Sequence, residues 1–440
     1  MAPTFVSQLF NSIADTGREL LDLRGGKKTS HDIKGYCRDL LTQRGEASGM
    51  ALARDVVEAW SRLEDEEKLD FLLFLHEEMA PDQEEIEEAV AAYHKEPTAE
   101  NYSLLSAAIE APRQELMRRI NFAPGGTAAI VAMRKFLVAN LKAHPVLKSV
   151  DADLQHLLSS WFNRGFLSLE RISWRTPAVV LEKLIEYEAV HEIDGWDDLR
   201  RRLDKDRRCF AFFHPALPDE PLIFVEVALV KGLARAIPPL LSREGRRGDP
   251  RKADTAIFYS ISNCQDGLKG ISFGNFLIKQ VVAELSAELP NLKHFATLSP
   301  IPGFMRWLKG VNEATGGLHF REIEAIRQEL ADPDWPNKTE VAEKIREPLE
   351  QLCAHYLINE KAGKRPLDPV TRFHLGNGAR LEQLNWLGDS SPNGLKQSAG
   401  LLVNYYYSQR DIEKNHEAYA NERRVVASSG LQALARSARK

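Results

Sequence analysis

The 440-residue sequence lacks the residue spacing of a metal site or of a disulfide framework. Its four cysteines stand singly, without a CxxC pair and without a histidine motif beside them: Cys37, Cys209, Cys264 and Cys353. We therefore expect no metal and a reducing environment. No apolar run is long enough to span a membrane, and the first residues carry no charged start followed by an apolar block. A membrane span is accordingly not expected.

The chain also lacks a strong charge of either sign, since its formal net charge is -5. Such a balance gives no electrostatic footprint for nucleic acid or for an anionic membrane, so we expect neither as a partner. A dense basic stretch, RRLDKDRR at 201–208, is interpreted as a solvated helix face, with a local anion site as the alternative.

The pattern of apolar and polar residues differs between the first part of the chain and the rest. Up to about residue 165, amphipathic helical periods such as GMALARDVVEAWSRL alternate with proline breaks at Pro81, Pro97, Pro112 and Pro124. Later runs, CFAFFHP, PLIFVEVALV and TAIFYSIS, are typical of buried strands. We predict an α+β protein in which an all-α helical bundle over 1–150 precedes an α/β domain over 151–440. Helices with two apolar faces need a second surface, so we expect a homo-oligomer formed through the bundle.

Three unevenly spaced glycines occur in CQDGLKGISFGNFLIKQVVAEL at 264–285, between a strand-like run and a helical one. Gly267, Gly270 and Gly274 fit neither a Walker A loop nor the dinucleotide spacing GxGxxG, which argues against ATP and NAD. The glycines either supply positive φ and close packing alone, or their turn holds a diphosphate on backbone N–H groups and a helix N-terminus. The turn by itself leaves both interpretations open.

Longer motifs follow, namely TLSPIPGFMRWL at 297–308 and YLINEKAGKRPLDPVTRFHLGNGARLEQLNWLGDSSPNGLKQSAGLLVNYYY at 356–407. Together with FYSISNCQDGLKGISFGNFLIKQVVAEL, they resemble the malonyl-CoA decarboxylase family from SWFNRGFLSLERISW onward. The resemblance implies a helical oligomerisation domain followed by a GNAT-like catalytic domain. It also implies conversion of malonyl-CoA to acetyl-CoA and carbon dioxide, with no cofactor.

The resemblance also implies site residues. Catalysis falls on Ser299 and His374, and malonyl-CoA binding falls on these two and on Lys269, Gly270, Ile271, Ser272, Phe273, Gly274 and Asn275. Some relatives carry an acidic residue at the position of Ser272, so no carboxylate role is transferred there. Within LLVNYYY, alternate tyrosines share one face of a strand, where core packing is their usual role. We choose Tyr407 as a supporting residue, together with Asn404 and Gly267.

The chemistry of the two proposed catalytic residues follows from their types. His374 suits proton donation because its ordinary pKa lies near neutrality, and RFHLGNGAR is interpreted as an extended segment running into an Asn-Gly turn. Ser299 lies before Pro300 in a stiff segment without a GxSxG elbow, so we expect hydrogen bonding with His374 and no acyl-enzyme. The thioester carbonyl is itself the electron sink, so the reaction needs no added cofactor.

Two other functions remain open at this stage. A GNAT-type acyltransferase would bind coenzyme A through the same glycine turn, but it also needs an acceptor, usually an amine, and a base. An acyl-CoA-binding scaffold would bind the ligand without turnover. The C-terminal LARSARK is not a peroxisomal signal, and we expect a bacterial-type cytoplasmic protein, with a mitochondrial form as the alternative.

Overall fold

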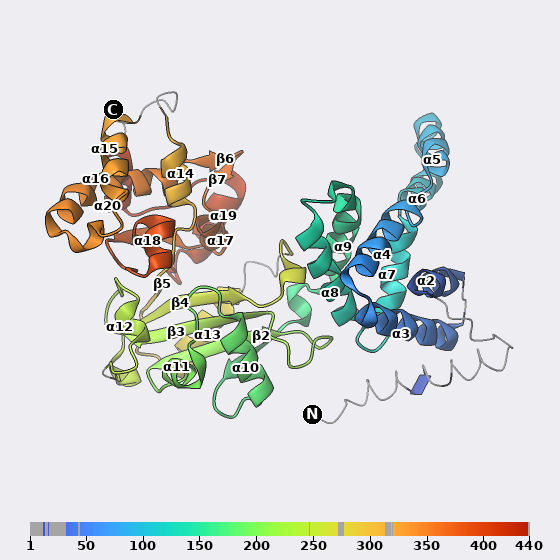
Figure 1. The fold of residues 1–440 in the computed structure, drawn as a ribbon, viewed down its shortest axis with the longest axis horizontal. Coiled ribbons are helices and arrows are strands. Elements are labelled where there is room, and N and C mark those ends of the chain that lie inside the picture. Colours follow the sequence, from blue (N-terminus) through green and yellow to red (C-terminus); the bar gives the residue numbers. More distant parts are fainter. Residues whose placement is uncertain are drawn as a thin grey trace. The chain divides into compact units, whose positions relative to one another are not determined.

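The computed structural model describes residues 12–13, 16, 32–42, 45–245, 247–271, 277–312, 318 and 320–438. The chain divides into two compact units (Figure 1). The first unit contains Met1–Leu167, His214–Glu220 and Gln265–Phe273, and the second contains Ser168–Phe213, Pro221–Cys264 and Gly274–Lys440. Two short segments that follow residue 167 in the sequence therefore belong to the first unit.

Helices build the first unit, and its described residues contain no strand. They are α2 (Ile33–Thr42), α3 (Glu46–Arg62), α4 (Asp65–Glu77), α5 (Gln83–Lys95), α6 (Ala99–Ala108), α7 (Pro112–Asn121), α8 (Gly126–Asn140) and α9 (Lys148–Trp161), with short 3-10 turns η1 (Pro145–Leu147), η2 (Arg164–Phe166) and η4 (Asp266–Leu268). Pro81, Pro97 and Pro124 lie between helices, and Pro112 is the first residue of α7, where a missing N–H costs nothing. The predicted helical N-terminal region is confirmed.

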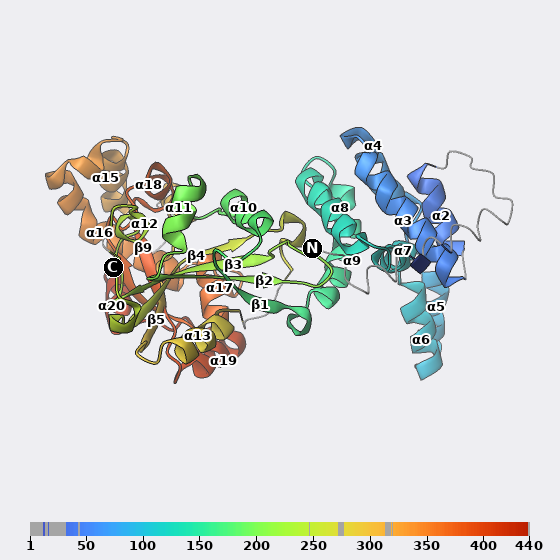
Figure 2. The same cartoon turned by 90° about the horizontal axis from the view of Figure 1, so that it is seen from below.

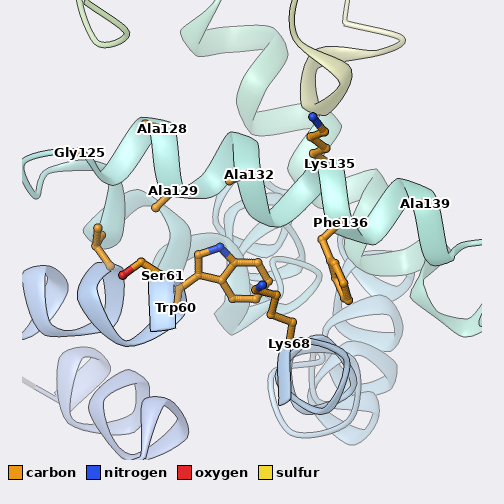
Figure 3. A pocket seen from close by; sticks show the side chains of 11 residues that line it. Trp60, Ser61, Lys68, Gly125, Ala128, Ala129, Ala132, Lys135, Phe136 and Ala139 are labelled. Atoms are coloured by element: carbon orange, nitrogen blue, oxygen red, sulfur yellow. The ribbon is translucent and has the colours of Figure 1, made fainter. Parts of the chain in front are cut away.

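A groove runs along α8 in this unit (Figure 3). Its volume is about 650 Å³, and the rings of Trp60 and Phe136 lie along it with a row of small residues. Those small residues are Gly125, Ala128, Ala129, Ala132 and Ala139. This groove contains none of the residues proposed for catalysis.

The second unit is built on a seven-stranded sheet in the order β1-β2-β3-β4-β5-β9-β8. The strands are β1 (Ser168–Ile172), β2 (Arg207–Phe213), β3 (Ile223–Val230), β4 (Thr255–Asn263), β5 (His294–Thr297), β8 (Arg380–Asn385) and β9 (Leu402–Tyr406); β6 (Lys361–Ala362) and β7 (Arg365–Pro366) form a separate pair. Only β4 and β5 run parallel among these described strand pairs. The three strand runs expected from the sequence coincide with β2, β3 and β4, and their residues are almost fully buried.

Helices cover both faces of this sheet. The helices of this unit are α10 (Ala178–Tyr187), α11 (Gly195–Arg202), α12 (Pro238–Leu241), α13 (Leu277–Glu288), α14 (Phe304–Gly310), α15 (Phe320–Leu330), α16 (Thr339–Asn359), α17 (Pro369–Gly376), α18 (Pro392–Ser398), α19 (Ile412–Glu422) and α20 (Ser429–Ser437), with 3-10 turns η3 (Pro250–Lys252) and η5 (Trp335–Asn337). Figure 2 shows α10 and α11 on one face and α13 on the other. Leu181, Leu184 and Leu199 pack on β2 and β3 in one apolar cluster. The α+β class is confirmed.

The basic stretch at 201–208 is not a solvated helix face, so that interpretation was wrong. Its first two residues end α11, and its last two begin β2. All four arginines, Arg201, Arg202, Arg207 and Arg208, are buried and pair with carboxylates of the chain. Arg202 binds Glu226 at 2.8 Å, and burial raises the pKa of Glu226 to about 8 against the attraction of that guanidinium. Because these carboxylates already pair with the guanidinium groups, nothing supports the alternative of an anion site.

Candidate active site

A pocket opens in the second unit where β4 and β5 diverge. Their parallel pairing ends at Phe258 and Thr297, and beyond it Ser299 pairs with Val403 of β9 instead. The pocket has a volume of about 260 Å³ and is mainly apolar. Its lining consists of Val190, Ile223, Phe258, Tyr259, Ser260, Ile261, Asn263, Leu298, Ser299, Pro300, Pro369, Val370, Phe373 and His374. Both residues expected for catalysis therefore line one pocket.

Ser299 is held by strand pairing. Its backbone N–H donates to the carbonyl of Val403 at 2.9 Å, and its carbonyl accepts from the N–H of Val403 at 3.0 Å. The Ser299 hydroxyl donates to Oγ1 of Thr297 at 2.7 Å and lies 3.2 Å from Nε2 of His374. Both side chains are nearly inaccessible to solvent, so the pair is shielded from water.

His374 lies on a helix, and the expectation of an extended segment was wrong. Asp368 caps α17 by accepting from the N–H of Thr371 at 2.7 Å, and Pro369 occupies the first helical turn. Asn377 and Gly378 end the helix, with Gly378 at φ +83°, so they form a helix C-terminus and not a hairpin turn. The Asp-Pro start was present in the sequence and is the signal that would have predicted this helix.

Two tyrosines from β9 and the residue after it hold the imidazole. The Tyr407 hydroxyl lies 2.7 Å from Nδ1 of His374. The ring of Tyr405 stacks on that of His374, with centroids 4.3 Å apart and planes at 26°. The Tyr405 hydroxyl in turn meets Oγ1 of Thr371 at 2.7 Å. Alternate tyrosines thus share one face, as expected, and both face the histidine.

Burial controls the protonation of this group. It lowers the pKa of His374 to about 3 and raises the pKa of the Tyr407 phenol well above its usual value. At neutral pH the free protein therefore holds a neutral imidazole against a protonated phenol. The pKa of His374 therefore lies below the ordinary histidine value, because the ring is buried in a largely apolar setting and its described hydrogen-bond partners are hydroxyl groups.

Thr297 is a polar residue of this site that sequence reasoning missed. Its Oγ1 accepts from the Ser299 hydroxyl and from the N–H of Tyr405 at 3.2 Å, so it joins β5 to β9. Its position two residues before Ser299 on an extended segment was the available signal, since such residues share a face. Asn404 lies on the other side of β9, where its amide donates to the carbonyl of Thr297 at 2.7 Å and its oxygen accepts from Asn385. It braces the strands and does not line the pocket.

The glycine turn belongs to the helical unit. Gly267 lies so close to α8 that a Cβ there would meet the carbonyl oxygen of Val131 at 2.1 Å. Gly270 adopts φ +83°, which L side chains rarely adopt. Lys269 and Ile271 flank Gly270 here. Ser272, Phe273, Gly274 and Asn275, also expected to bind substrate, lie outside the described residues.

Two family models match the chain in its own order. The malonyl-CoA decarboxylase N-terminal domain matches residues 79–162, and the malonyl-CoA decarboxylase C-terminal domain matches residues 165–440. The chain belongs to the malonyl-CoA decarboxylase family. The family expected from the sequence motifs is therefore confirmed, and with it the enzyme class, a carboxy-lyase that acts on malonyl-CoA.

Individual members of the malonyl-CoA decarboxylase family agree with this assignment. The mitochondrial malonyl-CoA decarboxylase of Anser anser anser is 39% identical over 338 residues, which are 71% of this chain and 67% of the relative. The crystal structure of malonyl-CoA decarboxylase from Rhodopseudomonas palustris is 49% identical with a TM-score of 0.86, covering 91% of this chain and 98% of that one. The one from Agrobacterium vitis is 50% identical with a TM-score of 0.86, covering 92% and 99%.

Two features of the described part of the chain concern its surroundings and metal binding. None of its helices combines the length and apolarity needed to cross a bilayer. The same residues contain no cluster of three or more His, Cys, Asp or Glu side chains suited to a metal ion. All four cysteines are buried.

Proposed function

We propose that Ser299, His374 and Tyr407 form the proton-transfer site of malonyl-CoA decarboxylation. The observation that carries the proposal is the continuous contact from the Ser299 hydroxyl to Nε2 of His374, and from Nδ1 to the Tyr407 hydroxyl, along the wall of one pocket. A hydroxyl can either donate or accept, so Tyr407 suits both the neutral ring and the imidazolium. The three groups can therefore hold a proton and release it without rearrangement.

The chemistry makes modest demands on the protein. When carbon dioxide leaves, the electrons of the broken C–C bond move into the neighbouring thioester carbonyl and form an enolate. A proton then adds to the α-carbon, which gives acetyl-CoA. Because the substrate supplies its own electron sink, we propose that no cofactor takes part. The protein must hold the substrate, stabilise the developing charge and deliver one proton.

The required proton comes from solvent, and His374 takes it up when the substrate binds. In the free protein His374 is neutral, because burial lowers its pKa to about 3. A bound malonyl carboxylate brings an anion to this ring, and at about 4 Å and an effective dielectric constant of about 20 the attraction is about 4 kcal/mol. That attraction is enough to return the pKa of His374 toward neutrality. His374 thus takes up a proton on substrate binding and returns it to carbon, so the protonation of the enzyme is unchanged over one turnover.

The apolar walls of the pocket favour departure of carbon dioxide. Phe258, Leu298 and Val370 surround the polar pair with groups that cannot hydrate a carboxylate. A localised anionic charge is poorly solvated there, whereas the enolate spreads its charge and receives hydrogen bonds from Ser299 and His374. This difference in stabilisation is what lowers the barrier.

We also propose that the turn with Gly267, Lys269, Gly270 and Ile271, continued by Ser272–Asn275, binds the diphosphate of malonyl-CoA. The positive φ of Gly270 fits a turn that presents backbone N–H groups, and Lys269 supplies a cation. The arrangement of β4, this turn and α13 is the basis for proposing a GNAT-like fold for residues 151–440.

The helical region over 1–150 is proposed as the assembly domain of a homo-oligomer. Helices α5 and α6 bury none of their residues and project from the other helices of the unit (Figure 2). Val90, Tyr102, Leu104 and Ile109 are exposed on and beside this hairpin. Short helices are marginal without tertiary packing, so a second copy is the simplest cover for these apolar residues. We propose a bacterial-type cytoplasmic location for the assembly.

Product analysis tests the proposed function directly. Purified protein is incubated with malonyl-CoA, with and without an amine acceptor, and the products are identified by mass spectrometry. Acetyl-CoA and carbon dioxide formed in equal amounts without the acceptor support decarboxylation. Free coenzyme A released only with the amine would indicate an acyltransferase, and binding without turnover would indicate a scaffold; either result contradicts the proposal.

A further inference from the structure

A buried arginine of the helical unit donates hydrogen bonds to the main chain of the glycine turn. Arg134 of α8 is 1% exposed, and its three guanidinium nitrogens have three different partners. Nε donates to the carboxylate of Asp151 at 2.8 Å, Nη1 donates to the carbonyl of Gly267 at 2.6 Å, and Nη2 donates to the carbonyl of Lys269 at 2.9 Å. Two of the three bonds therefore fix the main chain of the turn.

The arginine is itself fixed. Gln155 donates to the second oxygen of Asp151 at 2.6 Å, so α9 orients the carboxylate that orients Arg134. Buried charge-assisted bonds of this kind are strong and geometrically specific, because the planar guanidinium presents its donors in a rigid fork. The turn is thus attached to a rigid pair of helices and not only to the strand that precedes it.

Two further contacts join the turn to α8. Gly267 approaches the carbonyl of Val131 so closely that no side chain fits between them. Lys135, one residue after Arg134, lies 3.6 Å from the carboxylate of Asp266, and Figure 3 shows Lys135 pointing from α8 toward the neighbouring pale yellow segment. Both contacts and both arginine bonds come from a five-residue stretch of one helix, 131–135.

We infer that Arg134 is a positioning residue for the malonyl-CoA-binding turn, which gives the helical unit a role in substrate binding in addition to its proposed role in assembly. This inference rests on the proposed function of the turn. Arg134 acts through the main chain: it orders the turn before the substrate arrives, and the entropy of ordering these residues is then not subtracted from the binding free energy. Loss of the arginine fork should weaken binding and leave the reacting groups unchanged.

The chain offers a closely matched control. Arg113 of α7 is also buried, and it too donates to one carboxylate and two carbonyls: to Asp153 at 2.6 Å and to Leu75 and Met79 at 3.3 Å each. All of its partners lie within the helices and the loops between them, and none lies in the glycine turn. A lysine at either position keeps the charge but cannot reproduce the fork. The two substitutions therefore disturb the bundle in similar ways and differ in whether they release the turn.

The experiment compares the parent with Arg134→Lys, Gly267→Ala and Arg113→Lys, and with Gly270→Val as a test of the turn itself. Three properties are measured: steady-state decarboxylation of malonyl-CoA, calorimetric binding of coenzyme A, and thermal unfolding. We expect Arg134→Lys and Gly267→Ala to raise KM and the Kd for coenzyme A by about tenfold or more while kcat stays within about twofold, the pattern of lost uniform binding. Arg113→Lys should lower Tm and leave KM and Kd unchanged.

Three results would overturn the inference, and they are distinguishable. If Gly270→Val raises KM but Arg134→Lys and Arg113→Lys both leave it at the parent value, the turn binds substrate and Arg134 does not position it. If Gly270→Val also leaves KM and Kd unchanged in a folded protein, the proposed role of the turn is wrong and the inference falls with it. Equal rises in KM for the two arginine variants would likewise mean a general effect of bundle stability.

Discussion

Nε2 of His374 lies 3.2 Å from Oγ of Ser299, although 75 residues separate them in the sequence. The contact depends on three pieces of structure: the pairing of Ser299 with Val403, the capped helix α17, and the tyrosines at the end of β9 and just after it. The first piece positions Ser299, the second positions His374, and the third holds the imidazole ring of His374. The predictions below separate their contributions.

Removal of the Tyr407 hydroxyl should slow turnover without unfolding the site. Tyr407→Phe leaves Nδ1 of a buried ring without its partner, a loss of about 1 to 3 kcal/mol, so we expect kcat to fall by about 10- to 100-fold. Tyr405→Phe is the matched control, because it keeps the ring that stacks on His374 and removes only the bond to Thr371. A similar kcat for both variants and the parent would argue against Tyr407 as part of the proton path.

The dependence of kcat on pH reports the proton taken up with the substrate. Since the complex must carry the proton on His374, kcat should fall as pH rises through the pKa of His374 in the complex. The free enzyme holds His374 neutral down to a pKa of about 3, so kcat/KM should show no acid limb at the ordinary histidine pKa of 6.5. A kcat that rises with pH between pH 6 and 9 would contradict substrate-linked protonation.

Acid stability provides a test that does not need turnover. The pKa of His374 is about 3 in the folded state and 6.5 in the unfolded state, so the unfolded chain binds more protons between these values. Stability is fully present above pH 6.5 and falls as pH decreases toward 3, by about 1.4 kcal/mol per pH unit from this group. His374→Asn should reduce that slope in urea unfolding at pH 4 to 6. An unchanged slope in His374→Asn would mean that the ring is protonated in the folded protein.

The buried arginines of 201–208 predict a stability effect that the sequence interpretation would not. Arg202→Met leaves Glu226 and Asp198 buried without their cation and should cost about 3 to 5 kcal/mol in the free energy of unfolding. Arg251→Met, at a side chain that is 87% exposed, should leave that free energy close to the parent value. Denaturant unfolding at pH 7 measures both. Equal stabilities would mean that the buried network contributes nothing net.

Much of the architecture was predictable from local pattern. The buried runs around Phe210, Val225 and Ile257 predicted strands because β-branched and aromatic residues fill a sheet covered on both faces, and the structure confirms them. The helical N-terminal region followed from amphipathic periods with proline breaks. These features depend on neighbours in sequence, which a single sequence displays.

The features that were mispredicted depend on distant partners or on ambiguous punctuation. The sequence could not indicate that Arg202 pairs with Glu226 or that Arg208 pairs with Glu288, so a basic run looked solvated. Asn377-Gly378 is equally typical of a hairpin and of a helix end, and only Asp368-Pro369 distinguished them. Ser299 and His374 were connected through family resemblance, because no local pattern brings residues this far apart together. Their catalytic roles stay a prediction.

The catalytic role of Ser299 and His374 is tested most directly by the kcat of His374→Asn and Ser299→Ala with malonyl-CoA as the sole substrate. Turnover is followed as acetyl-CoA and carbon dioxide, and folding is checked by circular dichroism. We predict that each folded variant loses two or more orders of magnitude in kcat, in line with the removal of a positioned proton donor, about 10²- to 10⁴-fold. Folded variants that keep the parent's kcat would contradict the proposed Ser299–His374 site.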